Sequence, residues 1–331
     1  MAEKKKQQAP KVQILSNDME KNLERMGKAP VPDTWKMSRD VGHKIAGRQL
    51  ELFTDNLDPD MTPDGTIIST VGIEDTSKMR FREFTQAVAQ ILYNQSVQSG
   101  HETDNTGIEK VLAKDYSDNY AEKTGKYEKK YAGIIIATLY EICQKAYGVK
   151  DPSTKQKREM QDFIDKLDNV KLEIRYPNGD IRRAKICSVM EEYIRQKNGA
   201  RLYKLQLHPF FSEQIGSNYA LHPQDIMKRL NDVTKRRTAA HLILLDYLAM
   251  QDKKNPCKMT GENFLTRTEL KNSFKINKKR TMKQVVNICE AMKAVRMVKE
   301  FQIIPQDLST FKEVIFTLDP DYVRPVEEKG K

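Results

Sequence analysis

The chain has 331 residues, with 57 Lys and Arg against 46 Asp and Glu, a formal net charge of +11 and a pI near 9.2. This length is typical of two domains, each large enough to bury a core without disulfides or metals. The four cysteines lack a CxxC spacing, and no apolar run approaches the roughly 18 residues of a membrane span. The composition argues against a disulfide scaffold, a zinc site and a membrane protein, and its excess of cations favours a polyanionic partner.

Residues 1–64 are poor in periodic apolar positions and rich in Lys, Gln, Pro and Asp. This composition predicts a flexible basic N-terminal arm. The arm opens with Lys4-Lys5-Lys6, and the apolar stretch of a secretory signal does not follow. We therefore expect a cytoplasmic protein.

Residues 66–215 are expected to form a first domain. Its leading helix, Phe81–Gln95, has apolar residues every three or four positions, as a core-facing helix does. The polar stretch Ser99–Lys130 follows and is interpreted as an insertion. The later elements are expected to be a strand at Gly133–Ala137, helices at Leu139–Tyr147 and Thr154–Asn169, a hairpin of Lys171–Tyr176 and Ile181–Val189, and a strand at Leu202–Leu207. Thr138…Glu141 has the spacing of a capping box, and Asn178-Gly179 is a strong hairpin signal.

Residues 220–323 are expected to form a second domain. The expected elements are a helix at Thr238–Met250, an extended run at Asn263–Leu265, helices at Arg267–Phe274 and Thr281–Met297, and strands at Lys299–Ile304 and Phe311–Leu318. Thr266…Glu269 repeats the capping-box spacing. Thr266 is therefore predicted to cap the short helix of this domain.

A gapless shift of 128 residues overlays Lys130–Pro177 on Lys258–Pro305. The shift places Thr138 on Thr266, and two apolar stripes with the spacing i, i+3, i+4, i+7 coincide. These stripes are Met160, Phe163, Ile164, Leu167 and Val170 on Ile288, Ala291, Met292, Val295 and Val298. We therefore predict an α+β protein built from the same structural unit twice.

The order of helix, strand, helix, turn, helix and hairpin in each unit is that of a winged helix-turn-helix. In such a motif the second helix of the pair lies in the major groove of DNA. The fold class predicted here is two tandem winged helix-turn-helix domains related by an internal repeat. A generic α+β packing unit without DNA binding remains the alternative.

The second long helix carries the stronger basic signal. Lys279, Lys283 and Asn287 follow one another at four-residue steps, opposite the apolar stripe. Arg and Lys can read guanine edges, and Asn and Gln can read adenine. The candidate base-reading residues on this side are Lys279, Arg280, Lys283, Gln284 and Asn287. At the helix entry, Lys278 and Lys279 are better placed for phosphates, and on the preceding helix Thr266, Arg267 and Lys271 could clamp the DNA backbone. Lys235-Arg236-Arg237 is a further basic run. The alternative is an exposed polar face that contacts only water.

The first domain is expected to make an auxiliary DNA contact and to serve in dimerisation. Its candidate residues are Lys155, Lys157 and Arg158 on the long helix and Arg182 and Arg183 in the hairpin. The same helix carries Glu159, Asp162 and Asp165, which make its surface less positive.

Motifs for catalysis are missing from the sequence. GxxxxGK[ST] and HExxH do not occur, and the five histidines are far apart. Tyr116, Tyr120, Tyr127 and Tyr131 could be nicking nucleophiles, but no metal-ligand cluster accompanies them. We expect a protein that is not an enzyme and needs no cofactor or metal.

Two stretches carry a resemblance to a known family. They are Leu139-Tyr140-Glu141-Ile142, and His222-Pro223-Gln224-Asp225-Ile226 with Arg237-Thr238-Ala239-Ala240-His241-Leu242 further on. With the order of elements over Thr66–Tyr322, they resemble the tandem winged-helix replication initiators of bacterial plasmids. The resemblance implies binding to repeated origin sites on double-stranded DNA, local strand opening, recruitment of host replication proteins and a homodimer or monomer–dimer equilibrium. It assigns the major groove to the second domain's long helix.

Three other functions remain open from the sequence. A winged-helix transcriptional regulator would have nearly the same sequence features. A protein-interaction scaffold could use the same units for docking without DNA. A nuclease or relaxase is disfavoured because the sequence lacks a metal constellation.

Overall fold

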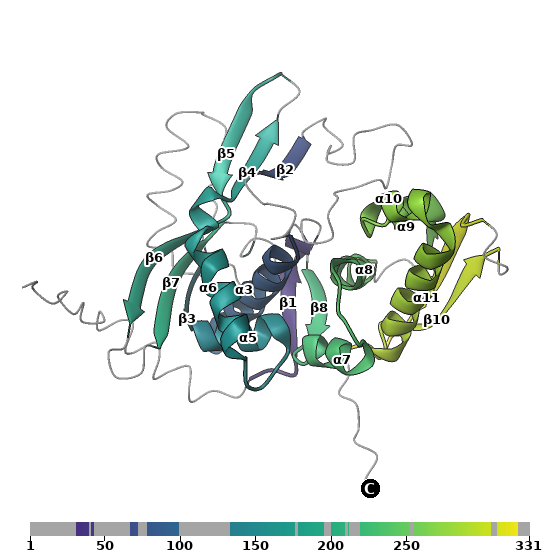
Figure 1. Cartoon of the computed structure of the whole chain (residues 1–331). Coiled ribbons are helices and arrows are strands. Elements are labelled where there is room, and N and C mark those ends of the chain that lie inside the picture. Colours follow the sequence, from purple (N-terminus) through teal and green to yellow (C-terminus); the bar gives the residue numbers. More distant parts are fainter. Residues whose placement is uncertain are drawn as a thin grey trace, which may run out of the picture.

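The computed structural model describes residues 31–39, 41–42, 67–71, 78–98, 133–175, 178–194, 200–208, 211, 219–251, 255–305 and 310–323. Within these ranges the fold is mixed α+β, with eight helices and small antiparallel sheets (Figure 1). Residues 1–30 of the expected arm and the expected insertion Ser99–Lys130 lie outside the described residues. None of the helices described has the combination of length and apolarity that crossing a membrane requires.

The N-terminal half confirms most of the expected elements. Its elements are β1 (Thr34–Ser38), β2 (Ile67–Val71), α3 (Lys78–Gln98), β3 (Gly133–Thr138), α5 (Leu139–Tyr147), α6 (Thr154–Asp165), a 3-10 turn (Leu167–Asn169), β4 (Lys171–Arg175), β5 (Ile181–Lys185), β6 (Cys187–Ile194) and β7 (Arg201–Leu207). The strands β1 and β2 were not expected, and the expected strand Ile181–Val189 is divided into β5 and β6. Thr138 caps α5 as predicted, since its Oγ1 accepts a hydrogen bond from Glu141 N at 3.1 Å. Ser153 and Gln156 form an unpredicted capping box that starts α6.

The C-terminal half differs more from expectation. Its elements are β8 (Tyr219–Pro223), α7 (Ile226–Val233), α8 (Ala239–Ala249), β9 (Cys257–Thr260), α9 (Gly261–Arg267), α10 (Lys271–Ile276), α11 (Lys278–Ala294), β10 (Val298–Ile304) and β11 (Glu313–Leu318). The run Asn263–Leu265, expected to be extended, lies inside α9. The turn expected between the two helices is reduced to Asn277.

The predicted capping role of Thr266 is wrong. The N-cap of α9 is Thr260, whose Oγ1 accepts from Asn263 N at 3.3 Å, and Thr266 lies near the helix end. Thr260 ends a strand in the extended conformation that an N-cap needs. The next residue must be a glycine, because a Cβ at Gly261 would lie only 1.9 Å from the carbonyl oxygen of Phe311. The segment before β11 therefore packs directly against the first residue of α9.

The two halves pair their strands in the same order. β3 pairs with β7 and β7 with β6, while β9 pairs with β11 and β11 with β10, all antiparallel. His208 N donates to Ile186 O at 2.8 Å in one sheet, and Asp319 N donates to Met297 O at 3.1 Å at the same place in the other. The hairpin β4–β5 forms as predicted, but it pairs with β2 instead of β3. The predicted match of this hairpin to β10–β11 is therefore wrong, since β6–β7 occupies that place.

Two separate apolar cores lie in the two halves. The N-terminal core surrounds α3, α5, α6 and the sheet β3-β7-β6, and the C-terminal core surrounds α8, α11 and the sheet β10-β11-β9. Every residue of the two predicted apolar stripes is buried. The stripe residues are Met160, Phe163, Ile164, Leu167 and Val170, and Ile288, Ala291, Met292, Val295 and Val298.

One part of the expected flexible arm is folded. β1 pairs antiparallel with β8, and Trp35 and Met37 are buried. Trp35 Nε1 donates to Pro223 O at 3.2 Å. The expectation of a flexible arm is wrong for this strand, because its partner strand lies far away in the sequence and composition alone does not reveal it.

Candidate nucleic-acid interface

The helix α11 separates an apolar side from a basic side. Asn277 caps it, since its Oδ1 accepts from Arg280 N at 3.0 Å, and Thr281 Oγ1 donates to Asn277 O at 2.9 Å. The buried side consists of Thr281, Met282, Val285, Ile288, Cys289, Ala291 and Met292. This packing holds the first turns of α11 rigidly against the core and leaves the other side in solvent.

Most residues predicted to contact DNA lie on that outer side. The exposed ones are Lys271, Lys278, Lys279, Arg280, Lys283, Gln284 and Asn287, and Lys275 of α10 joins them. We call these eight residues the basic face. The stretch 270–289 holds six Lys or Arg and no Asp or Glu. A polyanion could therefore approach α10 and the first three turns of α11 without meeting a carboxylate of these helices, whereas the exposed Glu290 lies in the last turns of α11.

Three cations of the basic face have no ion pair within the described part of the chain. Among the described residues, no ion pair holds Lys279, Arg280 or Lys283. Lys271, by contrast, is paired, since its Nζ lies 2.8 Å from Glu262 Oε1. This hydrogen bond lowers the pKa of the exposed Glu262. Lys278 lies over the ring of Phe274, 5.7 Å from its centroid.

Two predicted phosphate contacts have other positions. Arg267 is only 6% exposed, and its guanidinium lies 4.6 Å from the ring centroid of Tyr247. Thr266 is half-buried inside α9. Arg267 acts here as a packing residue between α9 and α8, and we place neither residue in the basic face.

The matching helix of the N-terminal half carries compensated charge. Lys155 Nζ lies 3.9 Å from Glu159 Oε1, and Lys157 lies over the Tyr140 ring, 5.8 Å from its centroid. Arg158 is exposed, as are the acidic Asp162 and Asp165. The predicted cations of α6 are thus on the surface, among carboxylates.

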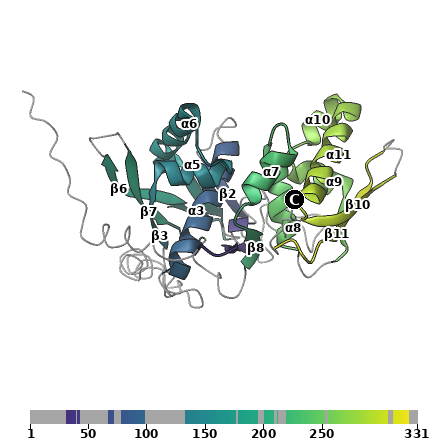
Figure 2. The same ribbon diagram turned by 90° about the horizontal axis from the view of Figure 1, so that it is seen from below.

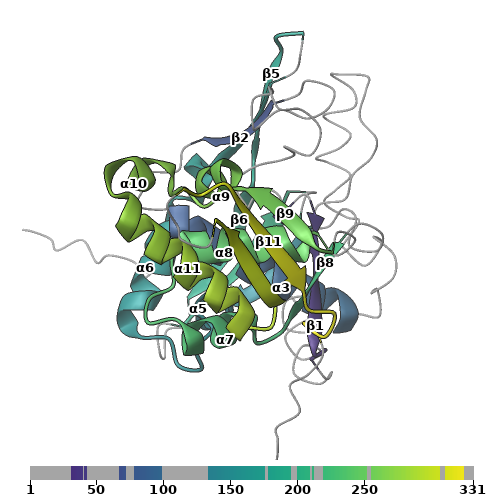
Figure 3. The ribbon, with the colours of Figure 1, turned by 90° about the vertical axis from the view of Figure 1, so that its right-hand side faces the viewer.

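The hairpin of the N-terminal half is also partly compensated. Arg183 Nε lies 2.7 Å from Glu173 Oε2 of the neighbouring strand. Arg182 belongs to β5, but its side chain lies outside the described part. Figures 2 and 3 show α6 on the same side of the molecule as α10 and α11. The two candidate regions could therefore meet one extended ligand.

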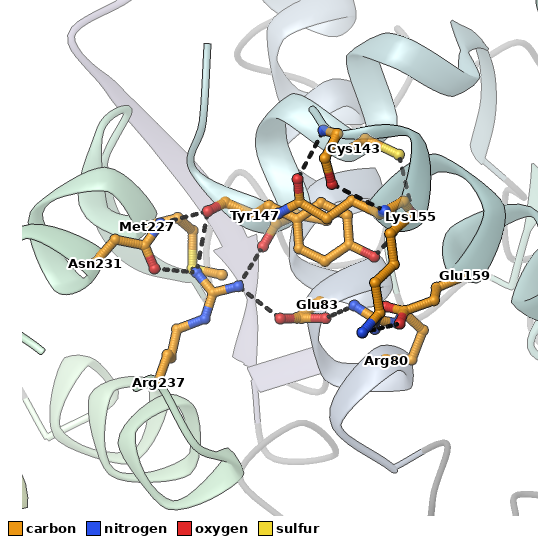
Figure 4. A network of polar contacts seen from close by, with 12 residues as sticks. Arg80, Glu83, Cys143, Tyr147, Lys155, Glu159, Met227, Asn231 and Arg237 are labelled. Carbon is orange, nitrogen blue, oxygen red and sulfur yellow. Dashed lines mark hydrogen bonds and ion pairs between the residues drawn. The ribbon is translucent and has the colours of Figure 1, made fainter. Parts of the chain in front are cut away.

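A buried ion-pair network joins the two halves (Figure 4). Arg237 precedes α8, and its Nη2 donates to Glu83 Oε1 of α3 at 2.6 Å. The same nitrogen donates to Ala146 O at 3.0 Å, at the end of α5. Arg80 binds the other oxygen of Glu83 and also Glu159 of α6. Arg237, part of the basic run noted in the sequence, is a buried structural cation, whereas Lys235 and Arg236 are exposed.

A second polar junction lies along α3. Gln86 Nε2 donates to both carboxylate oxygens of Asp246 at 2.9 Å, and Arg82 binds Glu269 at 2.8 Å. His222 Nε2 lies 3.7 Å from Asp246 Oδ1, and its Nδ1 lies 3.0 Å from Tyr322 Oη. Burial raises the pKa of Asp246 to about 8 and lowers the pKa of His222 to about 3. Both side chains are completely buried, and this burial disfavours the charged form of each.

Sequence reasoning did not select two residues that the structure brings to the basic face. Lys275 is exposed in the last turn of α10, and Ile276 ends that helix. The signal that could have identified them is the short spacing between Leu270, Phe274 and Met282, which leaves the residues between them outside the core. No group of three or more His, Cys, Asp and Glu in the described ranges is placed to hold a metal ion.

No protein-family model matches this chain, and a search of curated proteins finds no match.

Proposed function

We propose that this chain is a sequence-specific DNA-binding protein whose main contact is the basic face of α10 and α11. The observation that supports this most is the exposure of six Lys or Arg in a stretch without Asp or Glu, on helices whose opposite side is packed in the core. Double-stranded DNA is the polyanion whose major groove accommodates an exposed helix. Phosphates attract Lys271, Lys275 and Lys278, while Arg280, Lys283, Gln284 and Asn287 read base edges.

We further propose that each half is a winged helix-turn-helix. The equivalent parts are β3, α5, α6 and β6–β7 in one half and β9, α9–α11 and β10–β11 in the other. The common pairing order of their sheets supports this equivalence. The hairpin β4–β5 with β2 is then an addition to the N-terminal half, which makes a weaker DNA contact and serves in dimerisation.

The resemblance to plasmid replication initiators gives the biological role that we propose. The protein binds repeated origin sites as a monomer or homodimer in the cytoplasm, helps to open the duplex and recruits host replication proteins. This role requires no catalytic step, cofactor or metal. If a minimal replicon requires this gene in trans, the protein is an initiator. If the replicon copies itself without the gene, the protein is a transcriptional regulator.

The proposed interface is tested by fluorescence anisotropy on a duplex that the full-length chain enriches from a random-sequence pool. Arg280→Ala and Lys283→Ala should each weaken binding by about 1–3 kcal/mol if the side chain contacts a base. Arg158→Ala on α6 is the matched control, because it also removes an exposed cation and should cost less. Unchanged affinity in both α11 variants, with circular dichroism showing an intact fold, would contradict the assignment.

A further inference from the structure

One large apolar side chain lies unprotected within the basic face. Ile276 is 86% exposed, while the next most exposed large apolar residue among those described, Ile181, is 55% exposed. It is the last residue of α10, and the next residue, Asn277, caps α11. Lys275 and Lys278, on either side of this junction, are exposed as well.

Position and exposure together separate Ile276 from ordinary surface apolar residues. Single exposed apolar side chains are common and need no explanation. Ile276, however, is held at the start of α11 by the Asn277 cap, between cations that have no carboxylate nearby in the sequence. A partner that covers it must therefore be polyanionic and must still offer an apolar group next to the charges.

The major groove of DNA has both properties. Phosphates line its edges, and the 5-methyl group of thymine is the apolar group displayed on its floor. Apolar side chains at the start of a recognition helix can contact this methyl, which cytosine and uracil lack. Burying Ile276 against it would remove apolar surface of both partners from water.

We propose that Ile276 is a specificity-determining residue that contacts the 5-methyl group of a thymine and selects thymine at one position of the bound site. This inference rests on the proposed function, because it requires the basic face to bind DNA. It adds an apolar base contact to a face for which the sequence predicted only polar base contacts.

The test combines a one-methyl change in the DNA with a change in the protein. The probe is the duplex enriched by the full-length chain from a random-sequence pool, with each thymine replaced in turn by deoxyuridine, which keeps its base pairing. At one position we expect this replacement to weaken wild-type binding about fourfold, the effect of about one buried methyl group. Ile276→Ala should bind the thymine duplex at least about fourfold more weakly and should not respond to uracil at that position.

Two further variants control for folding and for charge. Ile194→Ala removes a 47% exposed isoleucine from β6, outside the basic face, and should retain wild-type affinity and the wild-type response to uracil. Ile276→Lys adds a cation, so it should bind scrambled duplexes more tightly while losing part of its preference for the enriched one. An unchanged preference in Ile276→Lys would show that Ile276 reads no base.

The remaining outcomes separate this inference from the proposed function. Uracil effects of equal size in the wild type and in Ile276→Ala would overturn the inference and leave DNA binding intact. Loss of self-association in Ile276→Ala, measured by sedimentation at unchanged DNA affinity, would assign the residue to contact between copies of the chain and would also overturn it. Failure to enrich any duplex, with affinity insensitive to salt, would overturn the proposed function itself.

Discussion

The two halves share an inner arrangement and differ on their outer surfaces. β3 precedes two helices, α5 and α6, and β9 precedes three, α9, α10 and α11, while each half pairs three strands in the same order. On the outer side, α6 mixes cations with Glu159, Asp162 and Asp165, whereas the basic face on α10 and α11 has no acidic neighbour in its stretch. Packing constrains the inner face of a helix and leaves its outer face free to acquire a separate role.

The junction between the halves offers the largest expected effect. Arg237→Ala removes a cation that is buried with Glu83 and leaves that carboxylate with one fewer partner. Breaking such a pair should lower the free energy of unfolding by about 3–5 kcal/mol. Urea denaturation of the full-length chain measures this. Arg236→Ala, an exposed neighbour, should change stability by less than about 0.5 kcal/mol, and equal losses in the two variants would contradict the structural role of Arg237.

The second junction should make stability depend on pH. The pKa of Asp246 is raised to about 8, above its value of about 3.9 in an unfolded chain. The folded chain then holds more protons between about pH 4 and 8, so stability falls as pH rises through this window. His222 and His241, with pKa values lowered to about 3 and about 4, act in the opposite direction, but only below about pH 6.5.

Between about pH 6.5 and 8, Asp246 should therefore contribute more to the pH dependence of stability than His222 or His241. Wild-type stability should fall by up to about 1.4 kcal/mol per pH unit, and Asp246→Asn should remove this fall. Urea denaturation at several pH values measures both slopes, and Asp232→Asn, an exposed acid on α7, is the control. A wild-type slope that persists in Asp246→Asn would show that Asp246 is ionised in the folded chain.

The smallest effects distinguish two alignments of the halves. Thr138 and Thr260 both cap helices, so replacing either by Ala should cost about 0.5–2 kcal/mol. Thr266→Ala should cost less than about 0.5 kcal/mol, because Thr266 caps nothing. A loss in Thr266→Ala as large as in Thr138→Ala would restore the gapless alignment that the sequence suggested.

That alignment shows what the sequence could reveal. The bounds of α5 and the burial of both apolar stripes are confirmed. A stripe with the spacing i, i+3, i+4 also matches itself after a shift of three residues, so Met160, Phe163 and Ile164 fit Val285, Ile288 and Cys289 equally well, and all six are buried. A helical stripe therefore establishes an inner face without establishing a register.

Loops of different length explain the rest of the discrepancy. The caps Thr138 and Thr260 are 122 residues apart (260 − 138), and the strand ends Leu207 and Leu318 are 111 apart (318 − 207). A single gapless shift cannot satisfy both. The sequence shift therefore located buried helix stripes but did not predict which strands pair.

Long-range packing is the other part that the sequence could not provide. The apolar residues of α3 predict its core side, but its polar Gln86 and Gln90 are also buried, against Asp246 and Gln224. Arg267 was predicted to contact phosphates, but its guanidinium packs on the ring of Tyr247. By contrast, the exposure of Lys279, Arg280 and Lys283 follows from the periodicity of their own helix.

The salt dependence of DNA binding tests the central claim most directly. It is measured by anisotropy on the enriched duplex for the wild type, for a double variant of α11 (Lys278→Ala, Lys279→Ala) and for a matched double variant of α6 (Lys155→Ala, Arg158→Ala). The logarithm of the wild-type affinity should fall linearly with the logarithm of salt concentration, by about 0.9 per phosphate contacted. The α11 variant should lose about two units of this slope if both lysines contact phosphates, and the α6 variant clearly less. A wild-type slope near zero, or equal slopes in the two variants, would contradict the account.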